Sequence, residues 1–269
     1  MRFISWETIF GIVAGFGLFG YAIFLSTDNT AIFWSVSSIL MVLGGTFAAT
    51  MISYQARYVL RTLKAMIGIL IPTQVNPATL FKDVGRILKW SEEVRRHGPA
   101  VLDEKMEKYE KKMDVFTKYG MSLLTTGYKG DELRELLTEF SESLYERSQV
   151  QVGVLKTMAS FAPSFGMIGT LVGLVIMLDN LKADVSQLGQ GLALALITTL
   201  YGVLAANMFF KPAALKTDQK NNMNRFRNVL MLEGFVMLSE RQDPLRMQDR
   251  LNSFLDPALH FDLMSEKKD

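Results

Sequence analysis

Residues 161–181 read FAPSFGMIGTLVGLVIMLDNL, and residues 188–210 read LGQGLALALITTLYGVLAANMFF. A bilayer core is about 30 Å thick and needs roughly 20 helical residues to cross it, because lipid offers no partner to unpaired backbone groups. Both stretches reach that length, and only the short segment around Lys182 to Gln187 separates them. The sequence therefore predicts a hairpin of two transmembrane helices.

Two further apolar stretches occupy the N-terminal part of the chain, at Glu7 to Ser26 and Ala31 to Ser53. Hydrophobic residues make up 49% of the sequence, and they are concentrated in these four blocks. The first block lacks the small-residue cleavage pattern of a signal peptide, so we expect it to be retained as a helix. The predicted fold is an all-α membrane protein with four transmembrane helices in two hairpins and a helical cytoplasmic domain.

The distribution of Lys and Arg predicts the side on which the polar segments lie. Of 29 such residues, 17 fall between Tyr54 and Ser160 and 10 follow Phe210. Basic residues close to the ends of the spans stay on the cytoplasmic side during insertion. We therefore expect both polar segments and both termini to be cytoplasmic.

These boundaries divide the chain into four regions. In the polar segments, apolar residues recur at spacings of three and four, which is typical of amphipathic helices. The expected regions are a first transmembrane hairpin (1–53), a cytoplasmic helical domain (54–160), a second, pore-lining hairpin (161–210) and a cytoplasmic helical tail (211–269).

Composition and motif context argue against several classes of function. The formal net charge of +2 and the lack of a basic patch argue against a nucleic-acid partner. The chain has no cysteine, and its two histidines lie far apart, so no metal site and no cofactor is expected. Gly15, Gly17 and Gly20 spell G-x-G-x-x-G, but inside an apolar span no strand-to-helix turn presents amides to a phosphate. No catalytic motif is recognisable, so the protein is not expected to be an enzyme.

The interiors of the four spans contain no Asp, Glu, Lys, Arg or His. A proton or cation that crosses hydrocarbon usually needs an intramembrane acid. Asp179 is the only candidate for such an acid in this chain, but its place beside Asn180 and Lys182 is typical of an interfacial helix end. If this protein conducts ions, a partner must supply the carboxylate.

Spans three and four carry hydroxyl groups instead, among them Thr170, Thr198 and Thr199. Such hydroxyls either line a hydrated ion path or bond to their own or a neighbouring helix. Pro163, at the entry to span three, predicts a kink through which a cytoplasmic domain moves a pore-lining helix. Pro212, just beyond span four, is expected to bend or end that helix.

Two stretches closely resemble the MotA/PomA family of flagellar stator subunits, namely APSFGMIGTLVGL at 162–174 and ALITTLYG at 195–202. The likeness extends over nearly the whole chain. It implies a channel-forming stator subunit in the bacterial inner membrane that converts ion flow into torque on the rotor. It also implies a ring, expected to be a pentamer, around a MotB/PomB-type partner whose single aspartate carries the ion.

The resemblance also implies roles for particular residues. Thr170 and Thr198 match family positions that face the partner's aspartate, and Pro163 and Pro212 match prolines that couple ion passage to conformational change. The family's cytoplasmic pattern of an arginine and an acid implies that the rotor protein FliG is contacted by Arg95 together with Asp103 or Glu104. The alternative for this charged cluster is a solvated helix face.

Other functions stay open at this point. A TolQ/ExbB-like energy transducer of the cell envelope shares the last two spans of the family, although such proteins usually lack the fourth span. A secondary transporter would place a substrate site between its helices. Hydroxyl groups suit a sodium ion and a hydrated proton path alike, with a slight preference here for sodium.

Overall fold

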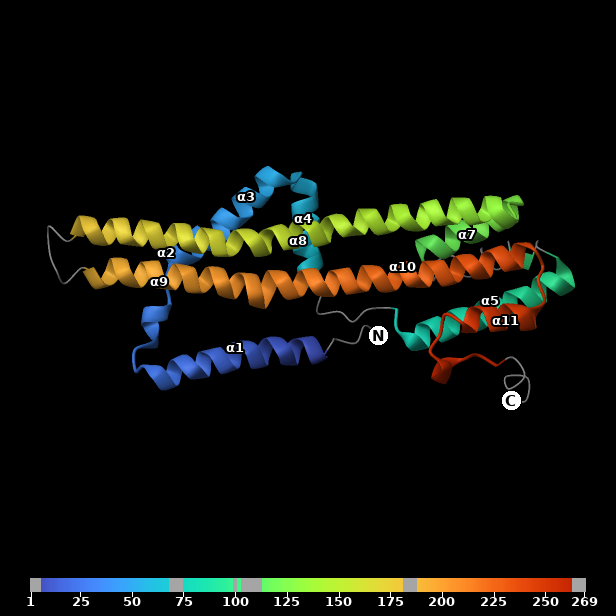
Figure 1. Cartoon of the computed structure of the whole chain (residues 1–269), viewed down its shortest axis with the longest axis horizontal. Coiled ribbons are helices and arrows are strands. Elements are labelled where there is room, and N and C mark those ends of the chain that lie inside the picture. The colour runs from blue at the N-terminus through green and yellow to red at the C-terminus, as the bar shows by residue number, and fades with distance from the viewer. Residues whose placement is uncertain (1–5, 68–74, 99–100, 103–112, 181–187, 263–269) are drawn as a thin grey trace. The chain divides into compact units, whose positions relative to one another are not determined.

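The computed structural model describes residues 6–67, 75–98, 101–102, 113–180 and 188–262, and every regular element in them is a helix (Figure 1). The chain forms two compact units. The apolar unit comprises Met1–Pro72 and Gln149–Asp218, and the polar unit comprises Thr73–Ser148 and Gln219–Asp269. The predicted all-α class is confirmed.

Four helical stretches are long and apolar enough to cross a membrane, which confirms the four predicted spans. The first is α1 (Trp6–Ser26), and the second runs from η1 (Thr30–Phe33) through α2 (Val36–Ile39) and the π-helix η2 (Leu40–Gly44) to α3 (Gly45–Ser53). The third lies in the C-terminal part of α8 (Gly130–Asn180), and the fourth consists of α9 (Leu188–Leu204) and the π-helix η6 (Ala205–Phe210). A short amphipathic helix, α4 (Ala56–Ile67), follows the second span.

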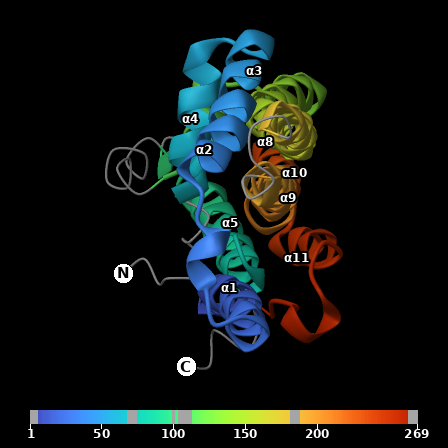
Figure 2. The ribbon, with the colours of Figure 1, turned by 90° about the vertical axis from the view of Figure 1, so that its left-hand side faces the viewer.

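Glycines bring the third and fourth spans into backbone contact, and α8 and α9 run side by side in Figures 1 and 2. A Cβ atom at Gly173 would lie 2.7 Å from the Ala195 nitrogen, and one at Gly202 would lie 2.6 Å from the Ala162 carbonyl oxygen. Small residues at such positions let two membrane helices approach closely. Gly173 and Gly202 therefore serve close helix packing inside a single chain.

The helix of the fourth span does not end at Pro212, although the sequence led us to expect this proline to bend or end it. The helix continues as α10 (Lys211–Ser239), and Pro212 is its second residue. Proline lacks the N–H that would bond the carbonyl four residues earlier, at Met208. The π-helical turn η6 directly precedes Pro212, and such turns absorb a break in the α-helical ladder.

The polar unit packs α5 (Pro77–His97), α7 (Val115–Thr126), the first part of α8, the second part of α10, α11 (Pro244–Asn252) and η7 (Pro257–Leu259) around one core. Phe116, Leu133 and Phe235 are among its buried side chains. Side-chain caps fix where the helices begin, since Asn76 accepts from the Thr79 N–H at 2.8 Å and Asp114 accepts from two N–H groups of α7.

Candidate ion pathway and rotor contact

Thr170 on α8 and Thr199 on α9 meet across the glycine contact of spans three and four. Their hydroxyl groups are in hydrogen-bond contact with each other. The Thr170 hydroxyl also lies 3.1 Å from the Ala195 carbonyl oxygen and 3.2 Å from that of Gly166. Both threonines are half-buried in the isolated chain, so this polar pair lies at the edge of the helix pair rather than in its interior.

Thr198 is the immediate neighbour of Thr199, but its hydroxyl has a different environment. It donates to the Leu194 carbonyl at 2.5 Å and lies 3.1 Å from the Ser38 hydroxyl on α2. Both Thr198 and Ser38 are fully buried. The structure thus brings Thr170 and Thr199 together and places Thr198 in the contact between the second and fourth spans.

A small hydroxyl network in the second span was missed by sequence reasoning. The Ser38 hydroxyl lies 2.9 Å from that of Ser35, and the Ser35 N–H donates to the Tyr201 hydroxyl at 3.3 Å. The Tyr201 hydroxyl in turn donates to the Phe33 carbonyl. The sequence does contain a signal that could have revealed this network, namely three serines within four residues of an apolar span, at positions 35, 37 and 38.

The two predicted coupling prolines both lie within continuous helices. Pro163 is inside α8, where it cannot donate to the carbonyl of Ala159, and its Cα lies near Gly202 on α9. Pro212 is exposed near the start of α10. Each proline therefore removes one backbone hydrogen-bond donor from a long helix.

Arg95 lies in the last turn of α5 and forms an ion pair that the sequence did not predict. Its Nη1 lies 3.0 Å from Oδ2 of Asp243, the N-cap of α11, and the two side chains are 62% and 46% exposed. The hydrogen bond from the Leu245 N–H, together with Arg95, lowers the pKa of Asp243. The two predicted acids, Asp103 and Glu104, lie outside the described residues.

Neither a metal centre nor an intramembrane acid is found in the described part of the chain. No group of His, Asp and Glu there is arranged to hold a metal ion. The polar groups that spans three and four bring together are hydroxyls, which can solvate an ion but cannot carry its countercharge.

Comparison with known proteins identifies the family. Residues 108–228 match the MotA/TolQ/ExbB proton channel family. Motility protein A of Borreliella burgdorferi is 32% identical over 250 residues, which cover 93% of this chain and 94% of that protein. The chain belongs to the MotA/TolQ/ExbB proton channel family.

Further relatives place the chain in the flagellar branch of the MotA/TolQ/ExbB family. The chemotaxis protein PomA of Vibrio alginolyticus is 29% identical over 93% of this chain and 94% of its own length. A solved structure of C. jejuni MotAB matches the fold with a TM-score of 0.85, covering 97% of this chain and 100% of that chain at 20% identity. The protein is thus a multi-pass membrane protein and a MotA/PomA-like flagellar stator protein, in a family of channels rather than enzymes.

Proposed function

We propose that this chain forms an ion channel only together with a MotB/PomB-type single-span partner, and that ion flow through the complex turns the flagellar rotor. The proposal rests on one observation: spans three and four pair hydroxyls at their edge, while no span interior contains an acid. The partner's aspartate would supply the missing carboxylate. An ion falling through the membrane potential releases about 2.3 kcal/mol per 100 mV, which drives a switch between two packings of the ring.

Ion flux through reconstituted protein tests this proposal. The full chain alone in liposomes is expected to pass neither protons nor sodium, whereas the chain with its partner is expected to pass one of them. An Asp→Asn change in the partner's span should return the flux to background. Flux through the chain alone would contradict the proposal.

Within the complex, Thr170 and Thr199 line the ion path directly, and Thr198 acts by holding α9 against α2. Thr199→Val removes a hydroxyl with little change in volume and is expected to reduce swimming speed and to change its dependence on sodium. Thr198→Val is a matched control one residue away, and it should lower thermal stability without changing ion dependence. Equal effects of the two variants on ion dependence would refute this division. Swimming speed with and without sodium identifies the transported ion.

The prolines are proposed to couple ion passage to movement of the helices. Pro163→Ala and Pro212→Ala each restore one backbone hydrogen-bond donor and stiffen a long helix. Both variants are expected to insert and assemble normally but to lose torque. Normal swimming by Pro163→Ala would remove that residue from the coupling role.

The rotor contact is proposed to involve Arg95 with Asp103 or Glu104, acting on FliG. In the described structure the charge of Arg95 is paired with Asp243, so a carboxylate of the rotor must compete with this acid. Asp243→Asn keeps the helix cap, because Asn caps as well as Asp does, and it removes the competing charge. It is expected to strengthen rotor binding, and Arg95→Gln should weaken it. Unchanged rotor binding by both variants would place the contact elsewhere.

Assembly and orientation complete the proposal: a pentameric ring in the bacterial inner membrane, with both termini and the polar unit in the cytoplasm. The native chain has no cysteine, so single cysteines can be introduced without further changes. Thr27→Cys is expected to react with an impermeant thiol reagent added outside, and Ser239→Cys is not. Mass measurement of the purified complex counts the copies.

A further inference from the structure

A cavity of about 550 Å³ opens within the polar unit. It is lined by residues of α5, of the start of α7, of α8 and of α10. Its volume is in the range of small-molecule sites, which run from roughly 300 to 1,000 Å³. Of the residues predicted to carry ions or to contact the rotor, those that the structure describes do not line it.

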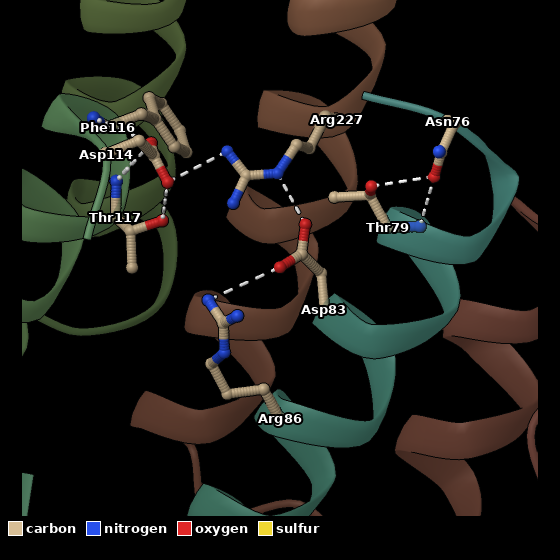
Figure 3. Close-up of polar contacts among 8 residues, drawn as sticks. All are labelled: Asn76, Thr79, Asp83, Arg86, Asp114, Phe116, Thr117 and Arg227. Carbon is tan, nitrogen blue, oxygen red and sulfur yellow. Dashed lines mark hydrogen bonds and ion pairs between the residues drawn. The ribbon is translucent and has the colours of Figure 1, made fainter. Parts of the chain in front are cut away.

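Asp83, Arg227 and Asp114 form an ion triad in the wall of this cavity (Figure 3). Arg227 donates through Nε to Asp83, and its Nη1 lies 2.8 Å from Oδ2 of Asp114. The side chains of Arg227 and Asp83 are 12% and 1% exposed. Arg86 adds a longer contact, at 3.4 Å from the other oxygen of Asp83. The triad ties α5, the start of α7 and α10 into one wall.

The acceptor oxygens of this wall are already occupied. Oδ1 of Asp114 accepts from the N–H groups of Phe116 and Thr117, each at 3.1 Å, and its Oδ2 accepts from the Thr117 hydroxyl at 2.6 Å as well as from Arg227. Burial raises the pKa of Asp114, but the charge of Arg227 and the bonds from Thr117 outweigh it, so the pKa lies below its ordinary value. The carboxylate oxygens of both acids are therefore already engaged as acceptors within the protein.

Hydrogen-bond donors, in contrast, remain available in the cavity. The side-chain nitrogen of Asn221 is buried and has no hydrogen-bond partner among the described residues, and the residue is only 8% exposed. Asn224 and Asn228 share its face of α10 and also line the cavity. Asparagine is a poor helix former, so four asparagines among residues 221–228, three of them lining the cavity, need a reason other than helix stability.

Two arginines add positive charge that can turn toward a ligand. The side chains of Arg86 and Arg225 are 42% and 44% exposed, and both line the cavity. Arg225 now bonds to Glu142 at 2.7 Å and lies over the Tyr145 ring. A guanidinium carries five N–H groups, so each of these arginines has donors beyond its present partner. Guanidinium groups are the preferred ligands of phosphate oxygens.

We propose that this cavity binds a small soluble anion that carries phosphate groups, a function separate from ion conduction. Arg86 and Arg225 hold the phosphate oxygens, and the Asn221 amide donates the hydrogen bond that it lacks in the empty cavity. The phosphate oxygens of the ligand supply the acceptor that the buried Asn221 nitrogen lacks.

Calorimetric titration of the full chain, purified with its partner, tests the site with inorganic pyrophosphate as the probe. We expect saturable binding of one pyrophosphate per chain, weakened at least about tenfold by Arg86→Gln, because a hydrogen bond to a charged group is lost. Arg246→Gln, an exposed arginine on α11 outside the cavity, is the matched control and should bind as the native chain does. No binding at about 1 mM pyrophosphate, or equal weakening in the control, would overturn the proposal.

Asn221→Leu separates loss of the site from loss of the fold. Removing a buried donor that lacks a partner is expected to raise the melting temperature of the ligand-free protein while weakening pyrophosphate binding. A variant that melts higher and still binds with native affinity would exclude Asn221 from the site.

Vesicles with and without phosphatidylglycerol distinguish a lipid headgroup from a soluble anion. Binding to the anionic vesicles alone, with no binding of free pyrophosphate, would refute the soluble ligand.

Discussion

Replacing Arg227 with alanine is expected to destabilise the polar unit by about 3 kcal/mol. The change leaves Asp83, whose side chain is 1% exposed, as a buried carboxylate without its main partner. Breaking a buried ion pair from one side typically costs about 3–5 kcal/mol. We expect the low end of that range because Arg86, 3.4 Å from the other carboxylate oxygen, retains part of the compensation.

Hydrogen exchange of the full chain measures this effect locally. A loss of about 3 kcal/mol should speed exchange of the protected amides of α5 and α10 by roughly 150-fold. Arg225→Ala is the control on the same helix, two residues away. Its pair with Glu142 has side chains 44% and 42% exposed, so its loss should cost less than about 1 kcal/mol. If the two variants speed exchange equally, the buried pair of Arg227 and Asp83 does not stabilise the unit.

Three further changes test the packing and the charges. Gly202→Ala forces a Cβ against a backbone oxygen 2.6 Å away and should destabilise the α8–α9 pair by about 1–3 kcal/mol in thermal melting, whereas Gly17→Ala, with no atom within 4 Å, should not. The hydrogen bond from Arg134 lowers the pKa of Glu233, so this acid stabilises the fold above pH 4.5, its ordinary pKa, and that stability is lost as the pH falls through the lowered value. Glu233→Gln should therefore flatten the acid limb of the stability profile, and an unchanged limb would contradict this. Ser38→Ala should lower stability in detergent by about 0.6 kcal/mol, and a loss several times larger would mean that the network does more than join two spans.

The spans and the all-α fold followed from the sequence because lipid leaves few solutions for an apolar stretch of about 20 residues. That inference depends on local composition alone, whereas the backbone contact of spans three and four at Gly173 and Gly202 is seen in the structure, where only small residues allow it.

Long-range partners could not be read in the same way. Asp243 lies 148 residues from Arg95 in the sequence. The residues around Asp243 predict a helix cap but do not predict a pairing with that arginine. The cavity was missed for the same reason, because α10 presents Asn221 and Arg225 to a space whose other walls come from distant segments. The continuation of the helix past Pro212 was not predicted, because a π-helical turn, which accommodates the missing donor, has no clear sequence signature.

The threonines show how helix geometry divides the roles of adjacent residues. Neighbouring side chains on an α-helix point about 100° apart, since about 3.6 residues complete a turn. Thr198 and Thr199 therefore face different neighbours. The structure turns Thr199 toward Thr170 and turns Thr198 toward Ser38. The proposed ion path along the α8–α9 edge would therefore have a hydroxyl from each helix, and Thr198 would fix the rotation of α9 that presents them.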